Sequence, residues 1–345
     1  MKKFVLIMLI FLWPFSVGAV GASSYIVMDQ DSKRVLEGSN INKESLIASI
    51  SKIMTCIVAL EQGNFDKTVK IDDSILKAYG SGIYIEVGEE LTLDDLLYGL
   101  MLRSGNDAAL AIAKAVAGDV KSFVFLMNEQ AKKIGMENTS FVNPSGLEEN
   151  DGTANKSTTY DMALLMRYAM QNNYFRKIVA TKDIVVKSSY KTYSWHNKNK
   201  LLSMYEYCTG GKTGFTKKAH RTLVTTASKD NKNLIVVTFN DGNDFVDHKN
   251  LYEKNFNLYK RKKILDKSKK YNKNYYVKDD YYLLVKDSDK VETKIKDNSI
   301  EVYVNDNLIN KVTLFFKRDT SLVFRLKEFI EWWEKIWLIL FGFFW

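Results

Sequence analysis

The spacing of apolar and polar residues divides the chain into strand-like and helix-like segments. Short apolar runs at Tyr25–Met28 and Arg34–Glu37 flank a polar turn and predict a β-hairpin. The apolar stretch Ile50–Leu60 predicts a buried helix. Two further β-rich runs, Arg221–Ala227 and Asn233–Asn240, predict a second hairpin. Strands at both ends with helices between them indicate an α/β or α+β layer architecture.

Capping residues mark two of the predicted helix starts. Thr92 precedes a helical run and Asp95 lies at the reciprocal position, which is the pattern of a capped N-terminus. Helices are expected over Leu96–Leu102 and Ala108–Val116, with a polar turn between them. The segment Thr158–Met170 begins with a similar cap. These helices supply the second layer of the expected architecture.

The composition of the chain changes near residue 249. From 249 to 278 there are 11 Lys or Arg against 2 Asp or Glu, and this excess equals the net charge of +9 of all 345 residues. Such a run is either a solvated linker or a patch that faces anionic lipid or wall polymer. Short β-like runs follow and predict a small all-β domain at 254–318; they are Tyr275–Val277, Tyr281–Val285, Ile300–Val304 and Lys311–Phe316.

The N-terminal segment has the three parts of a secretory signal peptide. Lys2 and Lys3 form a positive start, Phe4–Leu12 is apolar, and small residues lead to Ala22. We therefore expect residues 1–22 to be a signal peptide. The alternative is an uncleaved anchor helix, which the short apolar run disfavours. Either way, the rest of the protein is expected outside the cytoplasm.

The last segment, 319–345, has an amphipathic pattern. Charged residues take one helix face, and apolar residues recur on the other, at Leu322, Leu326, Phe329, Ile330, Trp333, Trp337 and Leu340. Residues 336–345 are almost wholly apolar but too few to span a bilayer, which needs about 20. We expect a helix that lies in the membrane interface and anchors the protein. The alternative is a terminal helix packed on the protein itself.

The stretch ASISKIMTC at 48–56 contains two serines and one lysine. Ser49 and Lys52 are three residues apart and share a helix face, whereas Ser51 is adjacent to Lys52 and points elsewhere. A serine becomes a good nucleophile when a base takes its proton, and a lysine can be that base when burial lowers its pKa. Ser49 is therefore the candidate nucleophile, with backbone N–H groups at the helix start available to an oxyanion. The plain alternative is a capping serine beside a surface lysine.

Two later turns carry further candidate chemistry. In the first, the Ser104 hydroxyl can relay a proton, and the amide of Asn106 can hold a peptide carbonyl. In the second, Lys212 and Thr213 precede a predicted strand and can grip a carboxylate, while Gly214 lets a substrate backbone approach closely. Each pattern alone is weak evidence for a catalytic site, because Ser, Gly and Asn are also ordinary turn residues.

The three patterns S-x-x-K, S-G-N and K-T-G occur together and in this order. With them, the chain resembles the low-molecular-mass penicillin-binding proteins that act as serine-type D-alanyl-D-alanine carboxypeptidases. The second pattern differs from the S-D-N of class A β-lactamases by Gly105, which is common in the carboxypeptidases. The resemblance covers about residues 24–253 and includes LMLRSGNDAALAIA, IGMENTSFVNPSGL, TTYDMALLMRYA and GGKTGFTKKAHRTLV. It implies a serine β-lactamase/transpeptidase-like catalytic domain, of the α/β (α+β) class, at 23–253.

The resemblance implies a catalytic role for four residues. Ser49 would attack the carbonyl between the two terminal D-alanines of a peptidoglycan stem peptide, and Lys52 would accept its proton. Ser104 would pass a proton to the leaving D-alanine, and Asn106 would position the peptide. Water would then hydrolyse the acyl-enzyme. A β-lactam antibiotic would acylate the same serine and leave slowly, so β-lactams are expected as covalent inhibitors.

The resemblance also implies a set of substrate-binding residues. Lys212 and Thr213 would hold the terminal carboxylate, beside Gly214. The backbone N–H groups of Ser49 and Phe215 would form the oxyanion hole. No cofactor, metal ion or nucleic acid partner is expected. The expected role is in cell wall biogenesis, on the outer face of the cell membrane.

Two alternative functions are compatible with the same motifs. One is an endopeptidase that cuts cross-links between stem peptides; the region after 249 disfavours it, because the endopeptidase branch usually lacks such a region. The other is a penicillin-binding, wall-binding protein with little turnover. The sequence has no Glu-x-x-Leu-Asn loop to supply a deacylating glutamate, so efficient β-lactam hydrolysis is not expected.

The histidines and cysteines give little support to other chemistries. His196, His220 and His248 lie in no serine-hydrolase or metal-binding pattern, so we expect each to be a surface or packed residue. His220 takes a position where the family usually has a small residue, often Gly. Cys56 is expected to be packed and Cys208 to be free or packed, with a disulfide between them as the alternative.

Overall fold

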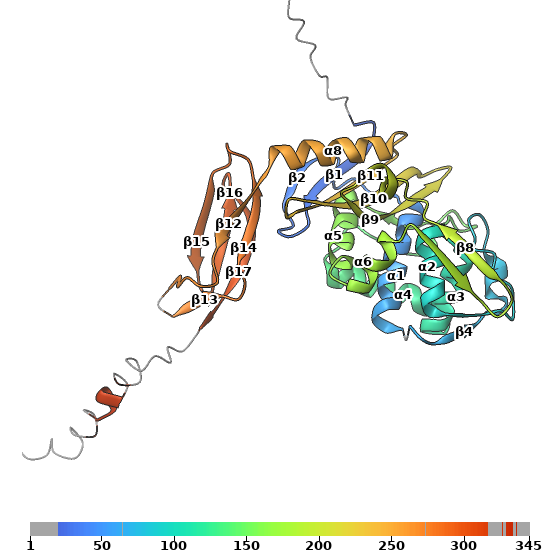
Figure 1. Ribbon diagram of the computed structural model, residues 1–345, viewed down its shortest axis with the longest axis horizontal. Helices are drawn as coiled ribbons and strands as arrows, with labels where there is room; N and C mark the ends of the chain where they lie inside the picture. The colour runs from blue at the N-terminus through green and yellow to red at the C-terminus, as the bar shows by residue number, and fades with distance from the viewer. Residues whose placement is uncertain are drawn as a thin grey trace, which may run out of the picture.

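The computed structural model describes residues 20–63, 65–272 and 274–316, together with 326, 329–333 and 336. Most of the predicted signal peptide, residues 1–19, lies outside the described residues, and so does much of the predicted C-terminal helix. The described chain forms a larger unit, from β1 to α8, and a group of strands that follows it (Figure 1).

A five-stranded antiparallel sheet forms the centre of the larger unit (Figure 1). Its order, β2-β1-β11-β10-β9, contains the two predicted hairpins, which are both confirmed. Among the residues that the structure describes, β9 is an edge strand, and one side of its backbone has no strand partner. The strands are β1 (Ser24–Asp29), β2 (Val35–Ser39), β9 (Cys208–Thr216), β10 (His220–Lys229) and β11 (Lys232–Phe239).

Successive side chains of the central strands face opposite helical layers. On β11, Ile235 and Val237 belong to the main core, whereas Leu234 and Val236 pack on the other face. Because both faces are buried, such a strand is a continuous apolar run instead of an alternating one. The main core contains α1 (Lys52–Gln62), α5 (Thr159–Ala169) and α6 (Asn173–Ala180), and the other face is covered by α8 (Asp244–Leu258).

Further helices extend the layer that carries the candidate site. The predicted cap of Thr92 and Asp95 is confirmed, because each side chain accepts a hydrogen bond from the other residue's backbone N–H. After a π-helical turn, the next helix begins at Asn106. These elements are η1 (Ala48–Ser51), η2 (Asp73–Lys77), α2 (Leu93–Tyr98), η3 (Gly99–Arg103), α3 (Asn106–Ala117), α4 (Val120–Ile134) and α7 (Leu201–Met204).

Short two-stranded ribbons connect the helices of the larger unit. The ribbon of β7 and β8 packs against the helical layer through Tyr193 and Trp195, which are buried and whose ring centroids lie 5.0 Å apart. The ribbons are β3 (Ser45–Leu46) with β6 (Lys156–Ser157), β4 (Thr68–Lys70) with β5 (Glu90–Thr92), and β7 (Asp183–Lys187) with β8 (Thr192–His196).

The chain after α8 forms strands, not a linker. The exposed basic residues Lys260–Lys263 lie on β12, and the predicted boundary after residue 253 falls within α8. Arg34 joins these strands to the larger unit through the carbonyl of Leu284, at 2.5 Å, and the carboxylate of Asp289, at 2.9 Å. The strands share a core of their own. They are β12 (Lys260–Leu265) paired with β14 (Tyr281–Val285), and β13 (Tyr275–Val277), β17 (Asn307–Phe316), β16 (Ser299–Val304) and β15 (Val291–Lys296) in one sheet.

The described residues of the last segment are helical and expose apolar side chains. Leu326, Phe329, Ile330, Trp332 and Trp333 are each more than half exposed. Their aromatic rings contact one another, with centroids 6.0 to 6.5 Å apart. Within the part of the chain that the structure describes, no helix is long and apolar enough to cross a membrane.

Candidate active site

Ser49 lies in the 3₁₀ turn η1, directly before α1 begins at Lys52. The Lys52 Nζ and Ser49 Oγ atoms lie 3.1 Å apart, as the helical spacing predicts. Ser51 is buried and donates its hydroxyl to the Ala48 carbonyl, 2.7 Å away. Ala48 has a left-handed backbone (φ 49°), which costs a non-glycine residue about 1–3 kcal/mol. The turn therefore presents Ser49 to Lys52 and directs Ser51 away from it.

The Lys52 side chain is buried and surrounded by oxygen atoms. Besides Ser49, its Nζ lies 2.7 Å from Asn106 Oδ1 and 2.5 Å from the Ser145 carbonyl. Asn106 comes from α3 and Ser145 from the segment after α4, so three distant parts of the chain fix one amine. The amine is held at hydrogen-bond distance from the Ser49 hydroxyl by contacts that do not depend on substrate.

The electrostatic surroundings of Lys52 favour its neutral form. Burial, and then the positive charges of Lys212 and Lys198, hold the pKa of Lys52 well below its ordinary value; Asp107 acts in the opposite direction. A neutral amine has a lone pair that can accept a proton, whereas an ammonium has none. Lys52 is therefore suited to be the base for Ser49.

Ser104 and Asn106 flank the start of α3. Ser104 ends the π-helical turn with a left-handed backbone (φ 64°), and its side chain is almost buried. The Asn106 side chain is fixed at both ends, because Oδ1 accepts from Lys52 and Nδ2 donates to the Tyr79 carbonyl at 2.6 Å. The Asn106 backbone N–H donates to the Ser81 carbonyl at 2.8 Å. The amide therefore has one orientation.

Strand β9 forms the opposite wall of the site. Lys212 is buried, and burial together with the charge of Lys198 lowers its pKa to about 7. Its Nζ donates to the Thr213 carbonyl at 2.7 Å. A Cβ at Gly214 would lie 3.0 Å from the backbone nitrogen of Ser49, so only glycine lets β9 pack this closely on η1.

A cleft of about 760 Å³ separates the two walls. Of the eight predicted site residues, Ser49, Ser104, Thr213, Gly214 and Phe215 line this cleft. The other three, Lys52, Asn106 and Lys212, lie buried behind the lining. The structure thus brings together residues that are up to 166 positions apart in sequence.

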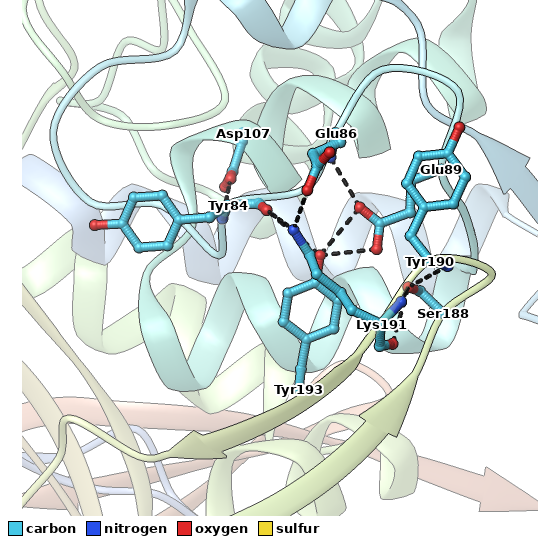
Figure 2. A network of polar contacts seen from close by, with 8 residues as sticks. All are labelled: Tyr84, Glu86, Glu89, Asp107, Ser188, Tyr190, Lys191 and Tyr193. Carbon is cyan, nitrogen blue, oxygen red and sulfur yellow. Dashed lines mark hydrogen bonds and ion pairs between the residues drawn. The ribbon is translucent and has the colours of Figure 1, made fainter.

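Asp107, which the sequence did not single out, organises the segment that contacts Asn106. Its carboxylate accepts hydrogen bonds from the backbone N–H groups of Ile83 and Tyr84, at 2.7 to 3.0 Å, and from that of Ala108 at 2.8 Å. Figure 2 shows this carboxylate at the Tyr84 backbone. An acidic residue in the first turn of a helix stabilises the helix N-terminus, which the sequence could have indicated for Asp107, but its contacts with Ile83 and Tyr84 depend on the packing of distant segments.

The same segment is held at its other end by a polar network (Figure 2). Buried Glu89 accepts from the Tyr193 hydroxyl at 2.8 Å and from the Glu86 backbone N–H at 2.8 Å. Lys191 donates to the Tyr84 carbonyl at 2.9 Å and to Glu86 at 2.6 Å. The β7–β8 ribbon therefore braces the segment whose carbonyls orient Asn106.

Charged residues outside the predicted set also line the cleft. Lys198 donates to the Ser81 hydroxyl at 3.1 Å, and burial followed by the charge of Arg103 lowers the pKa of Lys198. Arg221 of β10 forms an ion pair with Asp244 at the start of α8. Nothing in their local sequence marks these residues, because their partners come from other elements.

Within the described residues, no histidine or cysteine forms a hydrogen bond with the Ser49 hydroxyl, whose partner is Lys52. His248 of α8 is buried between this helix and the central sheet, and His196 and His220 are exposed. His220 has a left-handed backbone (φ 56°), which explains why a glycine suits this position. Cys56 and Cys208 are free thiols, as expected, and burial raises the pKa of Cys208 to about 11.

The family model that matches this chain and one of its curated relatives carry the same description. Residues 14–243 match the family described as D-alanyl-D-alanine carboxypeptidase. The chain is 35% identical over 224 residues to the D-alanyl-D-alanine carboxypeptidase DacF of Bacillus subtilis, a match that covers 63% of this chain and 57% of that protein's length.

Solved structures show the same fold. A D-alanyl-D-alanine carboxypeptidase from Mycobacterium tuberculosis superposes with a TM-score of 0.67 at 30% identity, covering 70% of this chain and 93% of the other. Penicillin-binding protein 5 from Haemophilus influenzae has a TM-score of 0.75 at 24% identity, covering 88% and 98%. The predicted resemblance is therefore confirmed: the chain belongs to the D-alanyl-D-alanine carboxypeptidase family.

Proposed function

We propose that this protein removes the terminal D-alanine from peptidoglycan stem peptides through a serine acyl-enzyme. The observation that carries the proposal is the Ser49–Lys52 pair, in which a buried lysine with a strongly lowered pKa lies 3.1 Å from a cleft-lining hydroxyl. The family membership of the chain supports the same reaction.

In the acylation step, neutral Lys52 takes the Ser49 hydroxyl proton as Oγ forms a bond to the scissile carbonyl carbon. The negative charge on the carbonyl oxygen is stabilised by the backbone N–H groups of Ser49 and Phe215. The bond between that carbon and the D-alanine nitrogen then breaks. Ser104 donates its hydroxyl proton to the leaving nitrogen and regains a proton from Lys52, which returns to its neutral form, and D-alanine departs as an amine.

Substrate is held from both walls of the cleft. Protonated Lys212 and the Thr213 hydroxyl bind the terminal carboxylate. The Asn106 amide positions the peptide. Gly214 leaves room for the substrate backbone beside β9, whose free edge supplies hydrogen-bonding groups.

Deacylation uses a water molecule, which adds to the acyl carbon and releases the shortened peptide while Ser49 regains its proton. A β-lactam enters the same cycle, because its strained amide acylates Ser49, but its ring-opened product stays attached. We therefore expect β-lactams to inhibit this protein covalently.

Free D-alanine released from a synthetic stem pentapeptide tests the proposal directly. We expect stoichiometric release of D-alanine and tetrapeptide, and no release by Ser49→Ala. Cleavage of cross-linked dimers without release from pentapeptide would indicate an endopeptidase instead. Penicillin binding without turnover of either substrate would indicate a binding protein.

We also propose the following organisation: a signal peptide at 1–22, a catalytic domain at 23–253, a small β domain at 254–318, and an anchoring helix at 319–345. Separate cores in the two groups of strands support the division. The exposed aromatic side chains at Phe329 and Trp333 support an interfacial helix on the outer face of the cell membrane. Deletion of 319–345 is expected to release the protein from membranes; sedimentation with membranes after deletion would refute the anchor.

A further inference from the structure

Arg221 places a guanidinium in the cleft beside the substrate-binding strand. In the β9–β10 ladder it pairs with Phe215, and Leu223 pairs with Thr213. Side chains two positions apart on a strand share a face, so Arg221 lies diagonally across from Thr213. Both residues line the cleft with Ser49. A long side chain at this position reaches a group bound at Thr213.

The Arg221 side chain is fixed before any ligand binds. Its Nε lies 3.1 Å from Asp244 Oδ2 and its Nη2 lies 2.5 Å from Asp244 Oδ1, and the Phe245 ring centroid lies 5.3 Å from Cζ. Asp244 is buried, whereas the Arg221 side chain remains 44% exposed toward the cleft. The Asp244 carboxylate thus fixes the position of the Arg221 guanidinium and leaves part of it accessible from the cleft.

Part of the guanidinium is still available for hydrogen bonding. A guanidinium has five N–H donors, and two of its nitrogens face Asp244. Within the described part of the chain, Nη1 has no hydrogen-bond partner. Arg is well suited to carboxylates, because its planar fork donates two parallel hydrogen bonds.

From these contacts we infer that Arg221, anchored by Asp244, is a specificity-determining residue that recognises the free α-carboxylate at the end of the substrate. This inference rests on the proposed function. It assigns a carboxylate donor from β10 in addition to Lys212 and Thr213 of β9.

The competing explanation is that the ion pair only ties α8 to the sheet. The two roles differ in what they do to substrates. A purely structural pair would affect every substrate equally, whereas a carboxylate reader affects only substrates with a free terminal carboxylate.

The test compares two peptides that differ only at the end, one with D-Ala-D-Ala and one with D-Ala-D-Ala-amide. We expect the wild-type protein to prefer the acid. Arg221→Gln should lower kcat/KM for the acid by about 10- to 100-fold and change that for the amide by less than about threefold, because charge-assisted bonds are lost only with the acid. Arg221→Lys keeps the positive charge but not the planar guanidinium, so its kcat/KM for the acid should lie between those of the wild-type protein and Arg221→Gln.

Two matched variants control for charge. Lys200→Gln removes a cation that also lines the cleft, and Arg261→Gln removes an exposed guanidinium on β12. Both should leave the ratio of acid to amide turnover unchanged. The amide rate shows that Arg221→Gln is folded.

Equal losses for acid and amide in Arg221→Gln, or an unchanged ratio, would overturn the inference while leaving the proposed function in place. A wild-type protein that cleaves neither peptide would overturn the proposed function and this inference with it.

Discussion

The two walls of the cleft hold lysines in different ways. On the helical wall, Lys52 has three oxygen contacts and is directed at Ser49. On the strand wall, Lys212 has one backbone contact, to the Thr213 carbonyl, and its neighbour Gly214 lies against the Ser49 backbone. Both amines are buried, and both have lowered pKa values. The comparison shows that burial alone does not define a lysine's role.

The difference indicates a division of labour. The pKa of Lys52 is held well below its ordinary value, and the Ser49 hydroxyl lies 3.1 Å from its Nζ. Lys52 is therefore suited to take the hydroxyl proton. Lys212, with a pKa near 7, is still largely charged in mildly acidic solution and can attract an anion. Exchanging or removing either lysine should therefore have distinguishable effects.

Removing the base should have the largest effect. Lys52→Met keeps an apolar side chain of similar length but has no lone pair for the Ser49 proton. We expect penicillin acylation and peptide turnover to fall by at least about 10³-fold, because nucleophile and base act as a unit. Stopped-flow acylation measures this loss. Lys133→Met, an exposed change on α4, is the control and should leave the rate unchanged. Retained acylation in Lys52→Met would contradict the role assigned to Lys52.

Altering the packing between the walls should have the next largest effect. In Gly214→Ala, the added methyl group would lie close to the Thr222 hydroxyl and 3.0 Å from the Ser49 nitrogen. Strand β9 would have to shift, and a displacement of about 1 Å in a catalytic site costs on the order of 100-fold.

Gly242→Ala is the matched control, because a Cβ there would meet no atom within 4 Å. Acylation rates of the two variants measure the effect. Equal rates for Gly214→Ala and Gly242→Ala would show that the close approach of β9 to η1 is dispensable.

The pH dependence of kcat/KM should reveal both lysines. As pH falls through the lowered pKa of Lys52, the base becomes protonated and the rate decreases. As pH rises above about 7, Lys212 loses the charge that attracts the carboxylate, so kcat/KM should fall by up to about tenfold per pH unit.

Lys212→Met should lower kcat/KM and abolish the alkaline decline, whereas Lys200→Met should keep it. A decline near pH 7 that persists in Lys212→Met would assign that titration to another group.

Loosening the support of the helical wall should have the smallest effect. Tyr193→Phe removes the hydroxyl that donates to buried Glu89 (Figure 2). We expect a loss of about 1–3 kcal/mol in the free energy of unfolding and a decrease in turnover of only a few fold. Tyr190→Phe, at an exposed ring, is the control for both measurements, thermal melting and kcat. If Tyr193→Phe lowered turnover more than Lys52→Met does, the support of the helical wall would matter more than the base, contrary to this prediction.

The parts of the site that the sequence predicted are those with local geometry. Ser49 and Lys52 share a helix face at a fixed spacing, and the choice of Ser49 over Ser51 follows from it. Likewise, the cap at Thr92 and Asp95 lies within one helical turn. Such features depend on backbone periodicity, which a sequence records directly.

The parts that the sequence did not predict are contacts between distant elements. Arg221 meets Asp244 across 23 residues, and Glu89 meets Tyr193 across 104. Which polar residues become partners depends on how the elements pack. Strand β12 was missed for another reason, since Lys260–Lys263 have no apolar alternation.

The most direct test of the account is to locate the covalent adduct formed with labelled penicillin. After reaction and proteolysis, mass spectrometry of the peptide that contains ASISK identifies the modified residue. We predict one adduct, on Ser49, that is lost in Ser49→Ala and retained in Ser51→Ala. An adduct on Ser51, or one that survives in Ser49→Ala, would contradict it.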